Sequence, residues 1–269
     1  MMKPIQFVRQ QRPSSAGASN PQFRLFCFPF AGGSPAVFSG WGQQLGPEIE
    51  VLAAHPRGRG MRFRERPDVS VQGMVEDLLP VLQTHLDLPY VLYGHSLGGL
   101  IAFEITRLLE MQGLRMPEHL FLGASAPPHL GLIHEAIHHL PNPEFVVALQ
   151  ERYAGIPQEV LREPELLAMF LPALKADFTA YELYQFREAE PVNCPISVFA
   201  GESDPGIRPA LLEQWSRHTS REFSFNVVPG DHFFLAESTP IVLASIQDAF
   251  SASSVGNQTA SAPAWATRA

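Results

Sequence analysis

Short apolar runs recur along the chain and give the first indication of its fold. Each has only four to six residues, and most are almost entirely apolar. Runs of this kind are typical of strands that are buried on both faces of a parallel sheet. Six of them predict strands, at 24–28, 51–55, 90–93, 119–123, 196–200 and 223–228.

Helical patterns lie between these runs. From residue 71 to residue 86 the apolar residues recur at every third or fourth position, the spacing of one face of a helix. Similar patterns predict helices at 97–111, 209–218 and 241–250. Strands that alternate with helices in this way indicate an α/β domain with a mostly parallel central sheet and helices on both faces.

One long segment, 127–190, interrupts this alternation. It shows no strand pattern, and prolines break its helical patterns. An insertion of this length between two strands is usually functional. The ends of the chain are polar or rich in small residues, which predicts a flexible leader at 1–22 and a disordered tail at 251–269 around a single domain, 23–250.

Composition excludes several classes of protein. The 269 residues carry a net charge of −8, whereas nucleic-acid-binding domains are usually basic. Only Cys27 and Cys194 are present, which excludes a disulfide-rich scaffold. No run of 18 apolar residues predicts a membrane span, and the first 20 residues lack the apolar core of a secretory signal. We therefore expect a cytoplasmic protein without nucleic-acid or membrane partners.

Residues 94–98 read Gly-His-Ser-Leu-Gly, a G-x-S-x-G motif. The motif directly follows the predicted strand 90–93 and directly precedes the predicted helix 97–111. The nucleophile elbow of a serine hydrolase requires this strand–turn–helix setting. A Cβ at either glycine would collide with the neighbouring strand or helix. The motif and its setting predict that Ser96 is a nucleophile.

A serine nucleophile needs a histidine to take its proton and an acid to orient that histidine. In hydrolases with such an elbow, the acid and then the histidine follow the serine along the chain. Asp204 and His232 each come shortly after a predicted strand, at the carboxyl end where α/β proteins bind ligands. We therefore predict a triad of Ser96, His232 and Asp204.

Other acids and histidines fit this triad less well. Glu202 is the fallback acid, since it lies in the same loop as the predicted aspartate. Asp177 lies in the insertion, and Asp231 adjoins the predicted histidine and would point away from it. We expect His218, at the end of a predicted helix, to lie on the surface.

The oxyanion that forms during acyl transfer needs two backbone N–H donors. One is expected at Leu97, directly after the nucleophile. The other is expected in the loop 28–34 after the first predicted strand, where we favour Ala31 over Phe30. Two glycines in this loop would let its backbone approach a substrate.

Residues 134–138 read His-Glu-Ala-Ile-His, the H-E-x-x-H motif of zinc proteases, with Glu159 downstream as a candidate third ligand. A zinc-binding helix should be long and rigid. Prolines and a glycine flank this motif, so we predict a solvated turn and no metal site.

Six segments resemble the stand-alone type II thioesterases, which are α/β-hydrolases that accompany polyketide and nonribosomal-peptide synthases, with relatives that serve fatty acid synthase. They lie between about residues 23 and 250 and read FPFAGGSPAVFSGW, HPRGRGMRFRE, YGHSLGGLIAFE, FLPALKADFTAYELY, FAGESDP and PGDHFFL. The resemblance implies an α/β-hydrolase fold, the triad and oxyanion donors named above, and a helical lid at 127–190. It also implies that acyl groups are hydrolysed from phosphopantetheine thioesters on acyl or peptidyl carrier proteins, to edit or release chains.

Five arginines crowd the ten residues that follow the second predicted strand, at positions 57, 59, 62, 64 and 66. A phosphate of the pantetheine arm or an acidic carrier surface would suit them. We predict such contacts for Arg62 and Arg64. The alternative is that the arginines are solvated or paired with acids of the same chain.

Together these features predict a monomeric serine thioesterase that needs no cofactor, because the substrate itself carries the phosphopantetheine. Phe30, Phe170 and Phe178 would shelter the acyl chain. The alternatives are a carboxylesterase or lipase that acts on small oxyesters with the same triad, and a non-catalytic partner of carrier proteins. An intact triad argues against the last of these, because a binding module does not need it.

Overall fold

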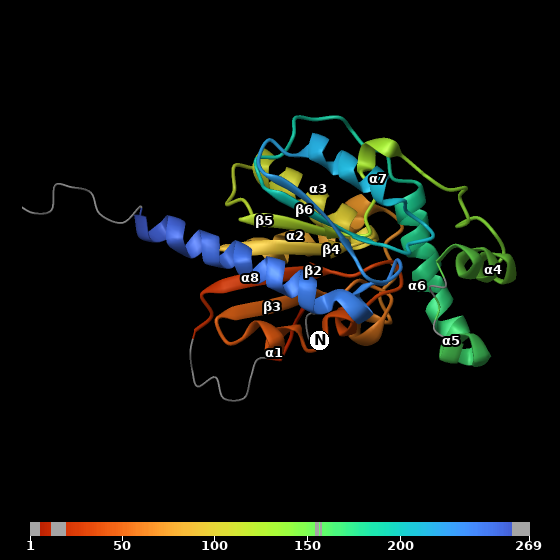
Figure 1. Cartoon of the computed structure of the whole chain (residues 1–269). Coiled ribbons are helices and arrows are strands. Elements are labelled where there is room, and N and C mark those ends of the chain that lie inside the picture. Colours follow the sequence, from red (N-terminus) through yellow and green to blue (C-terminus); the bar gives the residue numbers. More distant parts are fainter. Residues whose placement is uncertain (1–5, 12–19, 154–155, 157, 260–269) are drawn as a thin grey trace, which may run out of the picture.

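The computed structural model describes residues 6–11, 20–153, 156 and 158–259. Within them, one sheet has the strand order β1-β3-β2-β4-β5-β6-β7 (Figure 1). β1 runs antiparallel to β3, and all other neighbours are parallel. The strands are β1 Phe7–Arg9, β2 Phe23–Phe28, β3 Ile49–Ala54, β4 Tyr90–His95, β5 His119–Gly123, β6 Ile196–Gly201 and β7 Phe223–Val228.

The six parallel strands lie within two residues of the predicted runs, because the composition of most of them reflects burial on both faces. β7, at the edge of the sheet, is the exception and is only partly buried. Leu25 and Phe26 are neighbours on β2 and point to opposite faces of the sheet. Both side chains are fully buried, each in a different apolar cluster. A strand of this kind cannot show alternation of apolar and polar residues.

Helices cover both faces of the sheet (Figure 1). α2, α3 and α7 with the turn that follows it pack on one face, and α1 and α8 pack on the other. No helix in the described ranges is both long and apolar enough to cross a membrane. The helices are α1 Trp41–Leu45, α2 Val71–Gln83, α3 Leu97–Met111, α4 Asn142–Tyr153, α5 Gln158–Arg162, α6 Pro164–Glu182, α7 Pro209–Leu212 and α8 Leu235–Thr259.

The segment between β5 and β6 contains α4, α5 and α6, which lie together at one end of the sheet (Figure 1). These helices have an apolar cluster of their own, which includes Phe145, Leu149 and Phe178. The insertion is thus a separate small layer on an α/β-hydrolase fold, and the predicted fold class is confirmed.

Two predictions about the ends of the chain are wrong. Residues 7–9 do not belong to a flexible leader, because they form β1, and Phe7 packs edge-on against Phe26 of β2. Residues 251–259 are helical and extend α8 beyond the predicted end of the domain. The rest of the predicted tail, 260–269, and most of the predicted leader lie outside the described residues.

Candidate active site

Ser96 lies on a sharp turn between β4 and α3. Its φ of 53° and ψ of −118° are strained for a residue with a Cβ. A Cβ on Gly94 would lie 2.2 Å from the carbonyl oxygen of Gly98, and one on Gly98 would lie 2.1 Å from that of Phe28 on β2. The predicted need for glycine at both positions is confirmed, since the backbone has no room for a side chain there.

A line of hydrogen bonds joins Ser96 to its two predicted partners. His232 Nε2 lies 3.1 Å from Ser96 Oγ, and His232 Nδ1 lies 2.8 Å from Asp204 Oδ2. The other carboxylate oxygen, Oδ1, accepts the backbone N–H groups of Gly206 and Ile207 at 2.7 and 3.0 Å. Since three donors hold this carboxylate, its orientation toward the imidazole is fixed. The arrangement is that of a nucleophile, a base and an orienting acid.

The other acidic residues do not reach the imidazole. Glu202 and Asp231 are exposed, and the carboxylate of Asp231 accepts the backbone N–H of Phe233. Asp177 is buried on α6, where it contacts Arg59 and the loop after β2. Asp204 is therefore the acid of this arrangement.

The prediction that His218 lies on the surface is wrong. Its ring packs edge-on against Trp215 and Phe103, and its side chain is only 8% exposed. Its Nε2 lies 2.7 Å from Nδ1 of His129. Burial, together with the nearby His129, lowers the pKa of His218 to about 4. It lies against α3 instead of near the triad.

His95 has a positioning role in the geometry that the motif alone did not reveal. Its Nε2 lies 2.6 Å from the carbonyl oxygen of His232, and its Nδ1 lies 3.1 Å from the hydroxyl of Tyr93. Complete burial lowers the pKa of His95 to about 3, so its ring is neutral at physiological pH. A neutral ring that donates from Nε2 and accepts at Nδ1 satisfies both contacts. The only sequence signal was its place directly before the serine.

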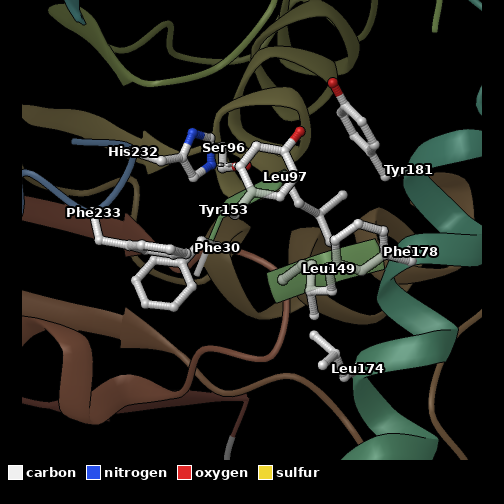
Figure 2. A pocket seen from close by; sticks show the side chains of 11 residues that line it. Phe30, Ser96, Leu97, Leu149, Tyr153, Leu174, Phe178, Tyr181, His232 and Phe233 are labelled. Carbon is white, nitrogen blue, oxygen red and sulfur yellow. Dashed lines mark hydrogen bonds between the residues drawn. The ribbon is translucent and has the colours of Figure 1, made fainter. Parts of the chain in front are cut away.

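A largely apolar pocket opens beside Ser96. Figure 2 shows the ring of Tyr153 next to Ser96 and His232, and its centroid lies 4.6 Å from that of the imidazole. The cavity volume is about 30 Å³, which is room for only one or two water molecules. The lining residues are Phe30, Ala31, Ser96, Leu97, Leu149, Tyr153, Leu174, Phe178, Tyr181, His232 and Phe233.

The predicted oxyanion and substrate residues fall into two groups. Ala31, Leu97, Phe30 and Phe178 all line the pocket. The N–H of Leu97 begins α3 and so has no acceptor within the helix. Phe170 is not among the lining residues, because its ring packs on the backbone of the loop after β2.

The prediction that Arg62 contacts a substrate or a carrier protein is wrong. Its guanidinium is 1% exposed and bonds to Asp77 on α2, to Glu65 and to the carbonyl oxygen of His55. The acids of the same chain therefore hold it in the interior. Arg64, in contrast, is exposed and makes no ion pair with any described residue.

Residues 134–138 are not helical, as the flanking prolines predict. The regular spacing that would place both histidines of the zinc motif on one helix face is therefore lost. His138 Nδ1 instead lies 2.7 Å from Glu182 on α6, and His134 contacts the carbonyl oxygen of Gly206. The side chain of Glu159 lies outside the described residues.

Comparisons with known proteins agree with this geometry. Residues 23–250 match the family model of the thioesterase domain. The chain is 38% identical over 220 residues to GrsT, a gramicidin S biosynthesis protein of Aneurinibacillus migulanus, with 82% of this chain and 86% of that protein covered.

Two solved structures are also similar. RedJ, a thioesterase of the prodiginine pathway in Streptomyces coelicolor, has 33% identity and a TM-score of 0.80, with 88% of this chain and 96% of RedJ covered. BorB, the type II thioesterase of the borrelidin biosynthetic cluster, has 30% identity and a TM-score of 0.81, with 93% and 99% covered. With a serine, a histidine and an aspartate aligned beside an apolar pocket, this chain belongs to the thioesterase family.

Proposed function

We propose that this thioesterase hydrolyses acyl groups from phosphopantetheine thioesters on acyl or peptidyl carrier proteins, and so edits or releases chains in polyketide or nonribosomal-peptide synthesis. The observation that carries the proposal is the hydrogen-bonded line from Ser96 through His232 to Asp204 at an apolar pocket. The biosynthetic roles of GrsT, RedJ and BorB support the substrate class.

The first half of the reaction transfers the acyl group to Ser96. Its Oγ attacks the thioester carbonyl carbon while its proton passes to Nε2 of His232. The N–H groups of Leu97 and Ala31 donate to the oxyanion of the tetrahedral intermediate. When the carbon–sulfur bond breaks, the proton on Nε2 passes to the departing sulfur, and the carrier leaves as a free thiol.

The second half returns the enzyme to its starting state. A water attacks the carbonyl carbon of the acyl-serine ester and gives a proton to Nε2 of His232. The bond between the acyl carbon and Ser96 Oγ then breaks, and that proton returns to the serine oxygen as the carboxylic acid leaves. The two halves together use one water molecule and groups of this chain alone, so the proposed chemistry requires no further cofactor.

The insertion acts as a lid over the acyl group in this proposal. Leu149, Phe178 and Tyr181 form an apolar wall that suits an acyl chain. The enclosed space is small, about 30 Å³, so we expect side chains of α4 or α6 to move when a long acyl chain binds. The exposed Arg64 remains available for an acidic carrier surface.

The test is hydrolysis of one acyl group presented as a carrier-bound thioester, a coenzyme A thioester and a small oxyester. We expect the highest kcat/KM on the carrier-bound thioester. A Ser96→Ala variant should lose about 10⁴-fold or more in kcat, because the nucleophile is removed. A preference for the oxyester would indicate a carboxylesterase, and full activity without the Ser96 hydroxyl would contradict the mechanism.

A further inference from the structure

A buried ion pair ties the insertion to the body of the enzyme. Asp177 lies on α6 and Arg59 lies in the loop after β3. Nη1 and Nη2 of Arg59 each lie 2.7 Å from one carboxylate oxygen of Asp177. The side chain of Asp177 is 2% exposed and that of Arg59 is 11% exposed. Such a bidentate ion pair fixes both the distance and the relative orientation of its two side chains.

The same two side chains also hold the backbone of the predicted oxyanion loop. Asp177 Oδ2 accepts the N–H of Gly32 at 2.7 Å, and Nη1 of Arg59 donates to the carbonyl oxygen of Gly33 at 2.9 Å. These two groups belong to the two residues that follow Ala31, the predicted donor. One ion pair, formed by residues far apart in the sequence, therefore bonds to the loop at Gly32 and at Gly33.

These contacts select one form of a tight turn. The N–H of Gly33 donates to the carbonyl oxygen of Phe30 at 2.8 Å, which closes a turn over residues 30–33. Gly32 has a φ of +77°, whereas Ala31 is not among the residues of positive φ. A positive φ at the third position alone defines a type II turn. Because Asp177 accepts the N–H of the central peptide, it holds that peptide in the type II orientation.

The apolar face of α6 presses on the same point. A Cβ added to Gly32 would lie 2.8 Å from Phe170 Cζ and 2.9 Å from Leu174 Cδ1. Helix α6 therefore contacts the turn through a carboxylate and through two apolar side chains. The position of the turn depends on the insertion as well as on β2.

We propose that Asp177 and Arg59 are positioning residues for acyl transfer: by fixing the type II turn at 30–33 they aim the N–H of Ala31 at the forming oxyanion. The inference rests on the proposed function in taking Ala31 as an oxyanion donor. Asp177 does not touch the reacting atoms. It acts through the backbone of the turn, and it makes the geometry of the oxyanion hole depend on the position of α6.

The alternative is that the pair only fastens α6 to the protein. The chain offers a matched control in Asp77, another buried carboxylate, which binds Arg62 with oxygen–nitrogen distances of 2.6 and 3.0 Å. Asp77 lies on α2, and its side chain bonds to Arg57 and Arg62 instead of the turn. Replacement of either aspartate by asparagine removes one buried negative charge, but only one of them touches the oxyanion loop.

The test compares Asp177→Asn with Asp77→Asn in the full chain. The rate at which a p-nitrophenyl alkylphosphonate labels Ser96 measures oxyanion stabilisation without reference to the natural substrate, and kcat and KM are measured on an acyl thioester. For Asp177→Asn we expect labelling and kcat to fall by about 10- to 100-fold, less than or equal to the loss of one oxyanion donor, with KM changed by less than about two-fold.

Asp77→Asn should lower the melting temperature and retain the labelling rate and kcat of the wild type. An Arg59→Lys variant, which keeps the charge but not the two-pronged geometry, should resemble Asp177→Asn. Equal labelling rates for Asp177→Asn and the wild type would overturn the positioning role. Absence of thioester hydrolysis in a wild type that the phosphonate still labels would instead overturn the proposed substrate class, so the two failures are distinguishable.

Discussion

The two walls of the pocket are built in different ways. One wall comes from the loops at the carboxyl ends of the strands and presents Ser96, His232 and the turn at 30–33, with hydrogen bonds of 2.6 to 3.1 Å that orient Ser96, His95, His232 and Asp204. The other wall comes from α4 and α6 and presents Leu149 and Phe178, whose neighbours are other apolar side chains. The first wall depends on the directions of its polar groups, and the second depends on the shapes of its apolar side chains.

This difference teaches where chemistry and selectivity reside in the molecule. A hydrogen bond loses most of its strength when its angle changes, so a catalytic wall must be rigid. An apolar wall tolerates changes of side-chain volume with a smaller loss. We therefore expect changes in the catalytic wall to slow the reaction of every acyl chain alike, and changes in the insertion wall to alter the preference among acyl chains.

The largest effect should come from Asp204→Asn in the catalytic wall. The asparagine oxygen can replace Oδ1 and keep the backbone N–H bonds of Gly206 and Ile207. Its NH₂ group then faces Nδ1 of His232, which must become an acceptor, so Nε2 carries the proton and cannot act as a base. We expect kcat to fall by about 10⁴-fold for all acyl chains, with little change in melting temperature.

Steady-state kinetics on short and long acyl thioesters measure this effect, and Asp231→Asn, an exposed neighbour, is the control that should keep full kcat. A loss of less than about tenfold in Asp204→Asn would mean that another acid orients His232. A loss that depended on chain length would contradict the distinction between the two walls.

A smaller and selective effect is expected from Phe178→Leu in the insertion wall. The shorter side chain enlarges the pocket, which should raise kcat/KM for long acyl chains relative to short ones by about tenfold, since even one methylene group in an apolar pocket is worth about that much. Initial rates across an acyl series measure the ratio.

The matched control is Phe145→Leu. Phe145 packs edge-on against Phe178 with ring centroids 5.5 Å apart, is fully buried in the same cluster and is not a lining residue of the pocket. It should lose stability without a change in the acyl ratio. If both variants changed the ratio of kcat/KM for long and short acyl chains equally, selectivity would depend on the packing of the whole insertion and not on a single residue of the wall.

Sequence patterns singled out Ser96, His232 and Asp204, which the structure brings together, because these residues follow local rules. Strand ends, glycine turns and the order of serine, acid and histidine each leave a mark in a short stretch of chain. The buried strands were equally clear. β1 was missed because three residues are too few to show a period, and α8 was cut short because small residues such as those at 251–259 give no apolar stripe.

What the sequence did not predict depends on contacts between distant residues. Arg62 is in the interior because Asp77 approaches it from α2, and no local pattern announces that pairing. The sequence indicated only that Asp177 lies in the insertion. Its hydrogen bond with Gly32 joins residues that are 145 positions apart in the chain. His218 is buried for the same reason, since its partner His129 begins the insertion.

The smallest effect concerns this last pair, which joins the start of the insertion to the turn after α7. Burial holds the pKa of His218 near 4, below its usual value of 6.5, with His129 and Arg217 adding to the shift. The unfolded chain therefore binds more protons than the folded chain between about pH 6.5 and pH 4. The stability from a neutral His218 is present above about pH 6.5 and is lost as the pH falls toward 4.

The neutral variant His218→Gln keeps an N–H donor for His129 and removes the titration. Because His95 and His119 also have lowered pKa values, near 3 and 4, both proteins should lose stability in acid. Between pH 7 and pH 5 we expect the melting temperature of the wild type to fall by about 3 °C more than that of the variant. Calorimetry measures both melting temperatures. If they fell equally between pH 7 and pH 5, the pKa of His218 would not change on folding, and the contact between His129 and His218 would not make the insertion sensitive to acid.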